Sequence, residues 1–176
     1  MPGFNQISED ETFYLPDVIS GIVTSIQTDS KPYFRWGYWK EIVDIMNELS
    51  KHQTSTVAMF PMVYLSLLYE ADKLNNRVTN AVDFDLFIIA ESKREYSSTE
   101  RLTTIFKGII DPIYDNLITA FLNNKWFGQK KRELPHREIN IFKAGAEDIN
   151  KNKLDQIIDA KHLSFKNIEI INLKIY

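Results

Sequence analysis

The fold is decided by residues 60–124, which read FPMVYLSLLYEADKLNNRVTNAVDFDLFIIAESKREYSSTERLTTIFKGIIDPIYDNLITAFLNN. Two apolar runs, at 60–72 and 80–92, have the length and the content of β-branched and aromatic residues that are typical of strands. A third segment, 97–124, carries apolar residues at helical spacing. The order strand, strand, helix predicts an α+β core.

The first predicted strand is apolar on both faces. Its two faces carry Val63, Leu65 and Leu67 on one side and Met62, Tyr64 and Leu68 with Ser66 on the other. Two apolar faces indicate a central strand or a strand that a partner covers.

The second predicted strand is apolar on one face and mixed on the other. The apolar face carries Val82, Phe84, Leu86 and Ile88. The opposite face begins with Asp83 and Asp85 and ends with Phe87 and Ile89. The residues LNNR between the two strands favour a turn, so we expect a hairpin or meander.

The third segment predicts a long helix that begins at Ser97. Ser97 and Glu100 match the capping box. The stripe expected to face the core is Leu102, Ile105, Phe106, Ile109, Ile113 and Leu117. Pro112 removes a backbone donor and crowds the carbonyl of Gly108, which predicts a kink between these two residues.

Segments on either side add further elements. Apolar spacing predicts an amphipathic helix at 15–26 that starts at Pro16, and a shorter helix at 39–51. EINIFKAG at 138–145 favours a short strand, and KLDQIIDAKH at 153–162 fits either a helical turn or an extended segment.

The C-terminal residues predict a half-buried strand. Ile171, Leu173 and Ile175 alternate with polar residues, while Ile168 and Ile170 fall out of phase with them. A β-bulge near Ile170 is therefore expected.

Together these segments predict a single α+β domain over residues 1–176. We expect an antiparallel or mixed sheet of about four strands, with the kinked helix at about 97–124 packed on one face and the N-terminal amphipathic helix nearby. Residues 1–12 are interpreted as a flexible N-terminal arm, and 125–165 as a long, partly irregular insertion.

Composition narrows the class of protein. The chain has 176 residues, with 21 basic and 24 acidic side chains, whereas a dedicated nucleic-acid binder is usually clearly basic. Cysteine is absent, which removes disulfides and thiolate sites. No secretory signal and no apolar run of about 20 residues is recognised, so a soluble protein with no membrane contact is expected.

No motif for catalysis or cofactor binding is recognised. The three histidines lack zinc-binding spacing, and neither a nucleophile elbow nor a phosphate-binding glycine loop occurs. The sequence therefore predicts a protein that is not an enzyme, with no catalytic residue, cofactor or metal.

Asp83 and Asp85 form a carboxylate pair on one strand face. Such a pair can act as acid and base or hold a cation. The favoured interpretation is a solvated sheet face. A third is an acidic surface lining a channel, where negative charge keeps a polyanion from sticking.

Two further segments are candidates for partner contact. Trp36, Tyr38 and Trp39 lie in a dense aromatic run with interleaved basic residues, which fits core packing, a subunit interface or base stacking. Lys130, Lys131 and Arg132 lie in a basic stretch that fits a solvated loop or a docking arm for an acidic partner or DNA; the three form the candidate docking loop.

In their order, these elements resemble the tail terminator (tail completion) proteins of long-tailed bacteriophages and the related neck, or head–tail joining, proteins. The likeness rests on an N-terminal helix, a strand starting at Phe60-Pro61 and a second strand, VDFDLFII. It continues with a helix containing Ile110, Asp111, Pro112, Ile113 and Tyr114 and with a terminal strand, INLKIY. It covers about residue 15 to the end. The WGYW insert and the segment 125–165 depart from the family pattern.

The resemblance implies a structural virion protein without catalysis, assembled in the cytoplasm of a bacterial host. Family members form hexameric rings that stop tail-tube growth and join tail to head, with DNA passing through the lumen. On this interpretation Trp36, Tyr38 and Trp39 contact a neighbouring subunit or partner, and Asp83 and Asp85 form an acidic ring surface.

Three other interpretations stay open. The first is a neck or head-completion ring on the portal, with a dodecamer as the assembly. The second is a small metal-dependent hydrolase or nuclease that uses Asp83 and Asp85. The third is a DNA-binding module that uses the WGYW cluster.

Overall fold

The computed structural model describes residues 14–51, 59–66, 70–73, 79–127, 134–144 and 157–171. The helices are α1 Leu15–Ser25, α2 Trp39–Lys51, α3 Ser98–Glu100, the π-helix η1 Arg101–Ile110 and α4 Asp111–Asn123. The strands are β1 Tyr33–Gly37, β2 Met62–Ser66, β3 Glu70–Lys73, β4 Thr79–Ser92, β5 His136–Ala144 and β6 Ile157–Ile171. The fold is α+β, as the sequence predicts.

The strands form one mixed sheet in the order β1-β2-β4-β6-β5. β1 pairs with β2 in parallel, and the other neighbours are antiparallel. The short strand β3 pairs with β4 beyond the stretch that β2 occupies. The sheet thus has more strands than the four expected, because Tyr33–Gly37 forms a strand where the sequence indicates only an aromatic cluster, and because residues 60–73 contribute two strands.

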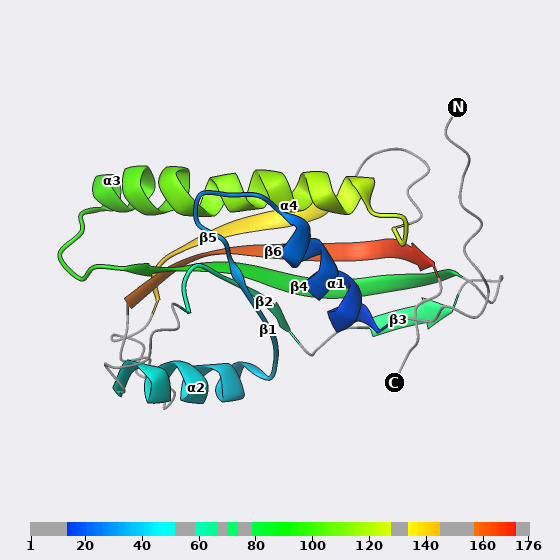
Figure 1. Cartoon of the computed structure of the whole chain (residues 1–176), viewed down its shortest axis with the longest axis horizontal. Helices are drawn as coiled ribbons and strands as arrows, with labels where there is room; N and C mark the ends of the chain where they lie inside the picture. Colours follow the sequence, from blue (N-terminus) through cyan, green and yellow to red (C-terminus); the bar gives the residue numbers. More distant parts are fainter. Residues whose placement is uncertain are drawn as a thin grey trace.

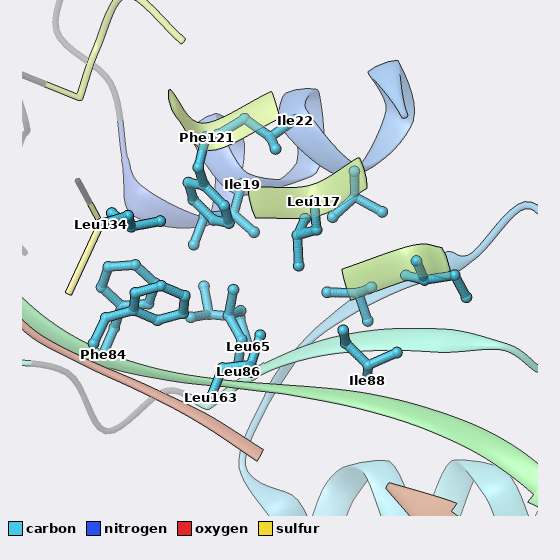
Figure 2. Packing of buried hydrophobic residues seen from close by; sticks show 14 of the residues in the cluster. Ile19, Ile22, Leu65, Phe84, Leu86, Ile88, Leu117, Phe121, Leu134 and Leu163 are labelled. Carbon is cyan, nitrogen blue, oxygen red and sulfur yellow. The ribbon is translucent and has the colours of Figure 1, made fainter. Parts of the chain in front are cut away.

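Helices cover both faces of the sheet (Figure 1). The long helix α3–η1–α4 runs across one face together with α1, and α2 lies on the opposite face. The larger core lies under α1 and α4, where Ile19 and Ile22 meet Leu117 and Phe121 above Leu86 (Figure 2). A smaller core packs Ile42 and Val43 of α2 against the other face.

β2 is buried on both faces within the chain itself. Met62, Val63, Tyr64 and Leu65 are all buried. Val63 and Leu65 belong to the larger core, while Met62 and Tyr64 belong to the smaller one. Of the two interpretations that the sequence leaves open, the central strand is the one observed.

The capping box predicted at Ser97 is confirmed. The Ser97 hydroxyl accepts the Glu100 N–H at 3.3 Å, and the Glu100 carboxylate accepts the Ser97 N–H at 2.8 Å. These hydrogen bonds from Ser97 lower the pKa of Glu100. The cap satisfies backbone donors that otherwise lack a helical partner.

The first part of the long helix has π-type hydrogen bonding, which the sequence does not predict. The Asp111 N–H donates to the Phe106 carbonyl, five residues back, and α-helical bonding begins at Asp111, directly before Pro112. The change in helix type therefore falls in the stretch Gly108–Pro112, where a kink is expected; the kink itself stays a prediction.

The wider π-turns change which side chains face the core. The buried residues of η1 are Arg101, Ile105, Phe106 and Ile110, spaced by four or five positions. Leu102, which 3.6-residue spacing places in the core, is exposed. Leu102 was therefore predicted wrongly, because the i→i+5 bonding pattern turns Arg101 inward instead.

Three expectations for the C-terminal half are settled in the described residues. The strand expected at 138–145 is confirmed as β5, and residues 157–162 are extended within β6. The expected bulge lies at Lys166–Asn167, opposite Asp83, and not near Ile170. Asn167 has a φ of 55°, a left-handed conformation that asparagine tolerates better than most residues.

Other expectations lie outside the described residues. These are the arm at 1–12, the turn LNNR at 74–77, and the last residues of the terminal strand, 172–176. Within the segment 125–165, interpreted as an insertion, the structure places β5 and more than half of β6.

A buried ion pair connects the long helix to β6. Arg101 and Asp159 are 3% and 0% exposed, and Arg101 Nη1 lies 3.0 Å from Asp159 Oδ1. The same guanidinium donates to Ser92 Oγ at 2.8 Å and to the carbonyls of Lys93 and Tyr96. The guanidinium thus bridges η1, β6 and the turn that leads into the helix.

Substituting Arg101→Gln is expected to lower the free energy of unfolding by about 3–5 kcal/mol, since a buried carboxylate that loses its cation is strongly destabilising. Urea unfolding followed by circular dichroism measures this. Arg94→Gln, at an exposed position on the same turn, is the matched control and is expected to change the value by less than about 0.5 kcal/mol. A loss below about 1 kcal/mol for Arg101→Gln would contradict the role given to this ion pair.

Candidate interaction surface

The face of the sheet that α2 covers only in part is the candidate interaction surface, called here the α2 face. It consists of the β4 side chains on the face opposite the larger core. Neighbouring side chains on β2, β5, β6 and α2 complete it. The β4 members are Asp83, Asp85, Phe87 and Ile89. This surface contains an apolar pocket, the pair formed by His162 and Asp85, and the β6 bulge, whose backbone binds the Asp83 carboxylate.

The pocket has a volume of about 300 Å³ and is lined mainly by apolar side chains. Trp39 contributes from α2, Tyr64 from β2 and Phe87 from β4, while isoleucines on β4, β5 and β6 complete the walls. Ser66 adds a side-chain hydroxyl to the lining. Pockets of this size and lining accept an apolar group of a ligand or partner.

Three aromatic rings form one side of the pocket. The ring centroids of Trp39 and Tyr64 lie 5.7 Å apart, as do those of Tyr64 and Phe87. The Tyr64 hydroxyl donates to the Gly37 carbonyl at 2.7 Å, which ties β2 to the end of β1. Burial raises the pKa of Tyr64, so the phenol keeps its proton. A buried hydrogen bond to the Gly37 carbonyl therefore fixes the Tyr64 ring in the pocket wall.

A histidine extends the aromatic row beyond the pocket. The ring of His162 on β6 stacks on Phe87 with centroids 4.4 Å apart and planes 6° from parallel. Its Nε2 lies 2.9 Å from Asp85 Oδ1. Because a carboxylate accepts hydrogen bonds, Nε2 carries the hydrogen. Beside the pocket, Asp85 thus holds His162 by a hydrogen bond.

Asp83 is held by the bulge in β6. Its Oδ1 accepts the Asn167 N–H at 2.6 Å, and its Oδ2 lies 3.1 Å from Lys166 Nζ. The backbone hydrogen bond from Asn167, with a smaller contribution from Lys166, lowers the pKa of Asp83. Both carboxylates of the predicted acidic surface therefore have a hydrogen-bond partner, and Lys166 compensates part of the charge of Asp83.

The aromatic run at 36–39 is exposed but does not form a single patch. Trp36, Tyr38 and Trp39 are 46%, 57% and 40% exposed. Trp36 lies beside Leu65, which belongs to the core under α1, whereas Trp39 lies at the pocket on the other face. Of the three, only Trp39 lines the pocket.

The candidate docking loop, Lys130, Lys131 and Arg132, lies outside the described residues. Within the described residues, no group of three histidine, cysteine, aspartate or glutamate side chains is placed to hold a metal ion. No helix in the described part of the chain is long and apolar enough to span a membrane.

Comparison of the sequence with known protein families and with curated proteins finds no match.

Sequence reasoning found Asp83, Asp85 and Trp39 but missed His162. The alternation in 80–92 places Phe87 on the same face as the two aspartates, and this was visible in the sequence. The position of His162 depends on the register between β4 and β6, which pairs Phe87 with His162. Since the segment around His162 could not be assigned to a strand, its partners could not be predicted.

The contact between Asp83 and the bulge is expected to weaken in acid. Because the folded state lowers the pKa of Asp83, the stabilisation is present above the unfolded pKa of about 3.9 and is lost as pH falls through the lower folded value. The amide proton shift of Asn167, followed by NMR, should move with a midpoint below about 3.9.

In Asp83→Asn the acid transition at the Asn167 amide should be absent. Asp44→Asn, on the exposed side of α2, is the control and should leave it unchanged. An Asn167 amide that does not titrate in the native chain would contradict this assignment.

Proposed function

We propose that the protein is a structural virion protein of a tailed bacteriophage, a tail terminator or connector that assembles as a closed ring at the head–tail junction. Its partners are copies of itself, with a hexamer favoured over a dodecamer, and other tail or neck proteins. DNA passes through the lumen. The protein carries out no reaction and needs no cofactor.

The order of the elements supports the proposal. Phe60-Pro61 directly precedes β2, and β4 runs antiparallel to it. The long helix with Pro112 follows and covers one face of the sheet (Figure 1). The order of β2, β4 and the long helix is the one that the resemblance to tail terminator proteins leads one to expect. β6 lies mostly in the segment 125–165 that departs from the family pattern, and the expected terminal strand, INLKIY, lies outside the described residues except for Ile171.

The observation that carries the proposal is the open apolar pocket on the α2 face. Trp39 is 40% exposed although it lies against two other aromatic rings. Tyr64, Ile89, Ile158 and Ala160 in the pocket walls are buried, so Trp39 is the exposed large apolar side chain at the pocket. Tryptophan is enriched at contacts between proteins. A neighbouring subunit or tail protein would bury this surface.

The sheet edges offer a ring contact surfaces that differ from the α2 face. Among the described strands, β1 and β5 end the sheet on opposite sides. Head-to-tail contacts between unlike surfaces close into rings when the rotation permits. Open strand edges are ready to pair with another chain. A ring could therefore use an edge and the α2 face of adjacent copies.

Asp83 and Asp85 keep their proposed place on a ring surface. Lys166 compensates part of the charge of Asp83, so this strip repels a polyanion less than two free carboxylates would. For the rival metal-dependent hydrolase, the same contacts are unfavourable because both carboxylates are engaged. A neck or head-completion ring on the portal differs from the tail terminator only in copy number and position.

Replacing Trp39 by alanine is expected to weaken self-association at least tenfold, because the side chain at the pocket is lost from the contact. Analytical ultracentrifugation and native mass spectrometry of the full chain measure this. Leu102→Ala, an exposed apolar residue on the other side of the sheet, is the matched control and should assemble like the unmodified protein.

Urea unfolding of each variant separates assembly from folding. Trp39→Ala should cost the folded subunit no more than about 2 kcal/mol, given its partial exposure. Complete unfolding would show that Trp39 belongs to the core instead. An unmodified chain that stays monomeric even with its tail or neck partners would contradict the ring.

A further inference from the structure

The first part of the long helix has a bonding pattern that its own apolar residues do not follow. Residues Arg101–Ile110 form η1, with π-type hydrogen bonds, between the α-helical segments α3 and α4. Bonding of this type is rare in proteins, occurs mostly as a single turn inside an α-helix and is frequent at functional sites. A continuous π-stretch of ten residues therefore calls for a physical cause.

The apolar residues of this segment are spaced for an α-helix. Side chains three or four positions apart share one face of an α-helix. Counted back from the buried Ile113, this spacing reaches Ile109, Phe106 and Leu102. In the structure Leu102 is 42% exposed and Ile109 is only half-buried, whereas Arg101 is 3% exposed. The start of the helix is thus displaced by one position from the arrangement that the apolar pattern favours.

Arg101 is held inward by four groups near the start of the helix. Its guanidinium donates to both carboxylate oxygens of Asp159, at 3.0 and 3.1 Å, and to Ser92 Oγ at 2.8 Å. It also donates to the backbone carbonyls of Lys93 and Tyr96. An α-helical register would turn Arg101 toward solvent and remove the cation from a carboxylate that is 0% exposed. Because a buried carboxylate that loses its cation is strongly destabilising, the ion pair opposes this change.

The residues at the two ends of η1 permit the helix type to change. The capping box of Ser97 and Glu100 fixes the start of the helix ahead of η1. At the other end Pro112 has no N–H, so the helix lacks a donor at this position under either bonding pattern. A change of register between these two points therefore leaves the cap and α4 in place.

We propose that Arg101–Ile110 is a two-state element of the fold. In the arrangement observed, the Arg101–Asp159 ion pair selects π-type bonding and keeps Leu102 in solvent. In the other arrangement the segment is α-helical, Leu102 enters the core and Arg101 turns outward. The buried ion pair thereby controls which residue the start of the long helix presents to solvent.

The two arrangements expose different chemistry at the same place. The π arrangement exposes an apolar side chain, and the α arrangement exposes a guanidinium. A partner shifts such an equilibrium only through different affinities for the two states, so an apolar surface that covers Leu102 favours the observed arrangement. The long helix lies across the sheet from α2 (Figure 1), so the two-state element is independent of the ring contact proposed for the α2 face.

Methyl NMR of the full chain with a soluble paramagnetic chelate tests the two-state element, because the chelate enhances the relaxation of exposed methyl groups. In the unmodified chain the enhancement at Leu102 should be comparable to that at Leu122, which is 36% exposed on α4. In Asp159→Leu, Arg101 loses its buried partner and should move to solvent. The enhancement at Leu102 should then fall at least about threefold, toward that of the buried Leu117, while Leu122 stays unchanged.

A double variant, Arg101→Gln with Asp159→Leu, removes both charges and should give the same result. Replacing both members of a buried ion pair is often neutral for stability, so this variant is expected to fold. Glu91→Leu, at an exposed acid on β4, is the matched control and should leave the enhancement at Leu102 as it is in the unmodified chain.

Leu102 methyl groups that stay fully accessible in both Asp159 variants would overturn the proposal, because the apolar pattern then does not select an α arrangement. Loss of the folded state in both variants, followed by circular dichroism, would also overturn it, because no second arrangement would then be available. Leu102 methyl groups that are protected in the unmodified chain would contradict it as well.

Discussion

The antiparallel pairing of β4 with β6 is the constraint on which the rest of the structure depends. It joins thirteen residue pairs, from Thr79–Ile171 to Ser92–Ile157, with one bulge opposite Asp83. Because side chains alternate along a strand, this single register assigns every β6 residue to a face. It directs Asp159 and Lys161 toward the long helix and His162 toward the α2 face. A slip by one residue would exchange the two sets.

Charged side chains of β6 that face the long helix fix the position of this helix on the sheet. Asp159 binds Arg101 near the start of the helix, and Lys161 binds Asp111 where the hydrogen bonding changes from π to α. Hydrophobic burial has no direction of its own, whereas two ion pairs at separate points fix the helix in both position and direction. Neither a buried pair such as Arg101–Asp159 nor a partly exposed one such as Lys161–Asp111 contributes much net stability, so their role here is better understood as positioning.

Patterns within one segment were predictable, and pairings between distant segments were not. The helix at 15–26, the capping box at Ser97 and the strand at 80–92 follow from local spacing, and all three are observed. Leu102 was assigned to the core because 3.6-residue spacing was assumed, but the π-turns bury Arg101 instead. The partners of Asp85 and Lys161 depend on the β4–β6 register, which leaves no local trace in the sequence.

The two faces of the sheet differ in how completely the chain covers them. The helix side is closed by α1 and α4, while the α2 face keeps an open pocket beside an exposed tryptophan. Electron cryomicroscopy of the assembled protein tests most directly whether this face is the contact in a ring. We expect a closed ring in which a neighbouring chain covers the exposed Trp39 and the half-buried Phe87. A ring that leaves these side chains in solvent, or particles that never close, would contradict it.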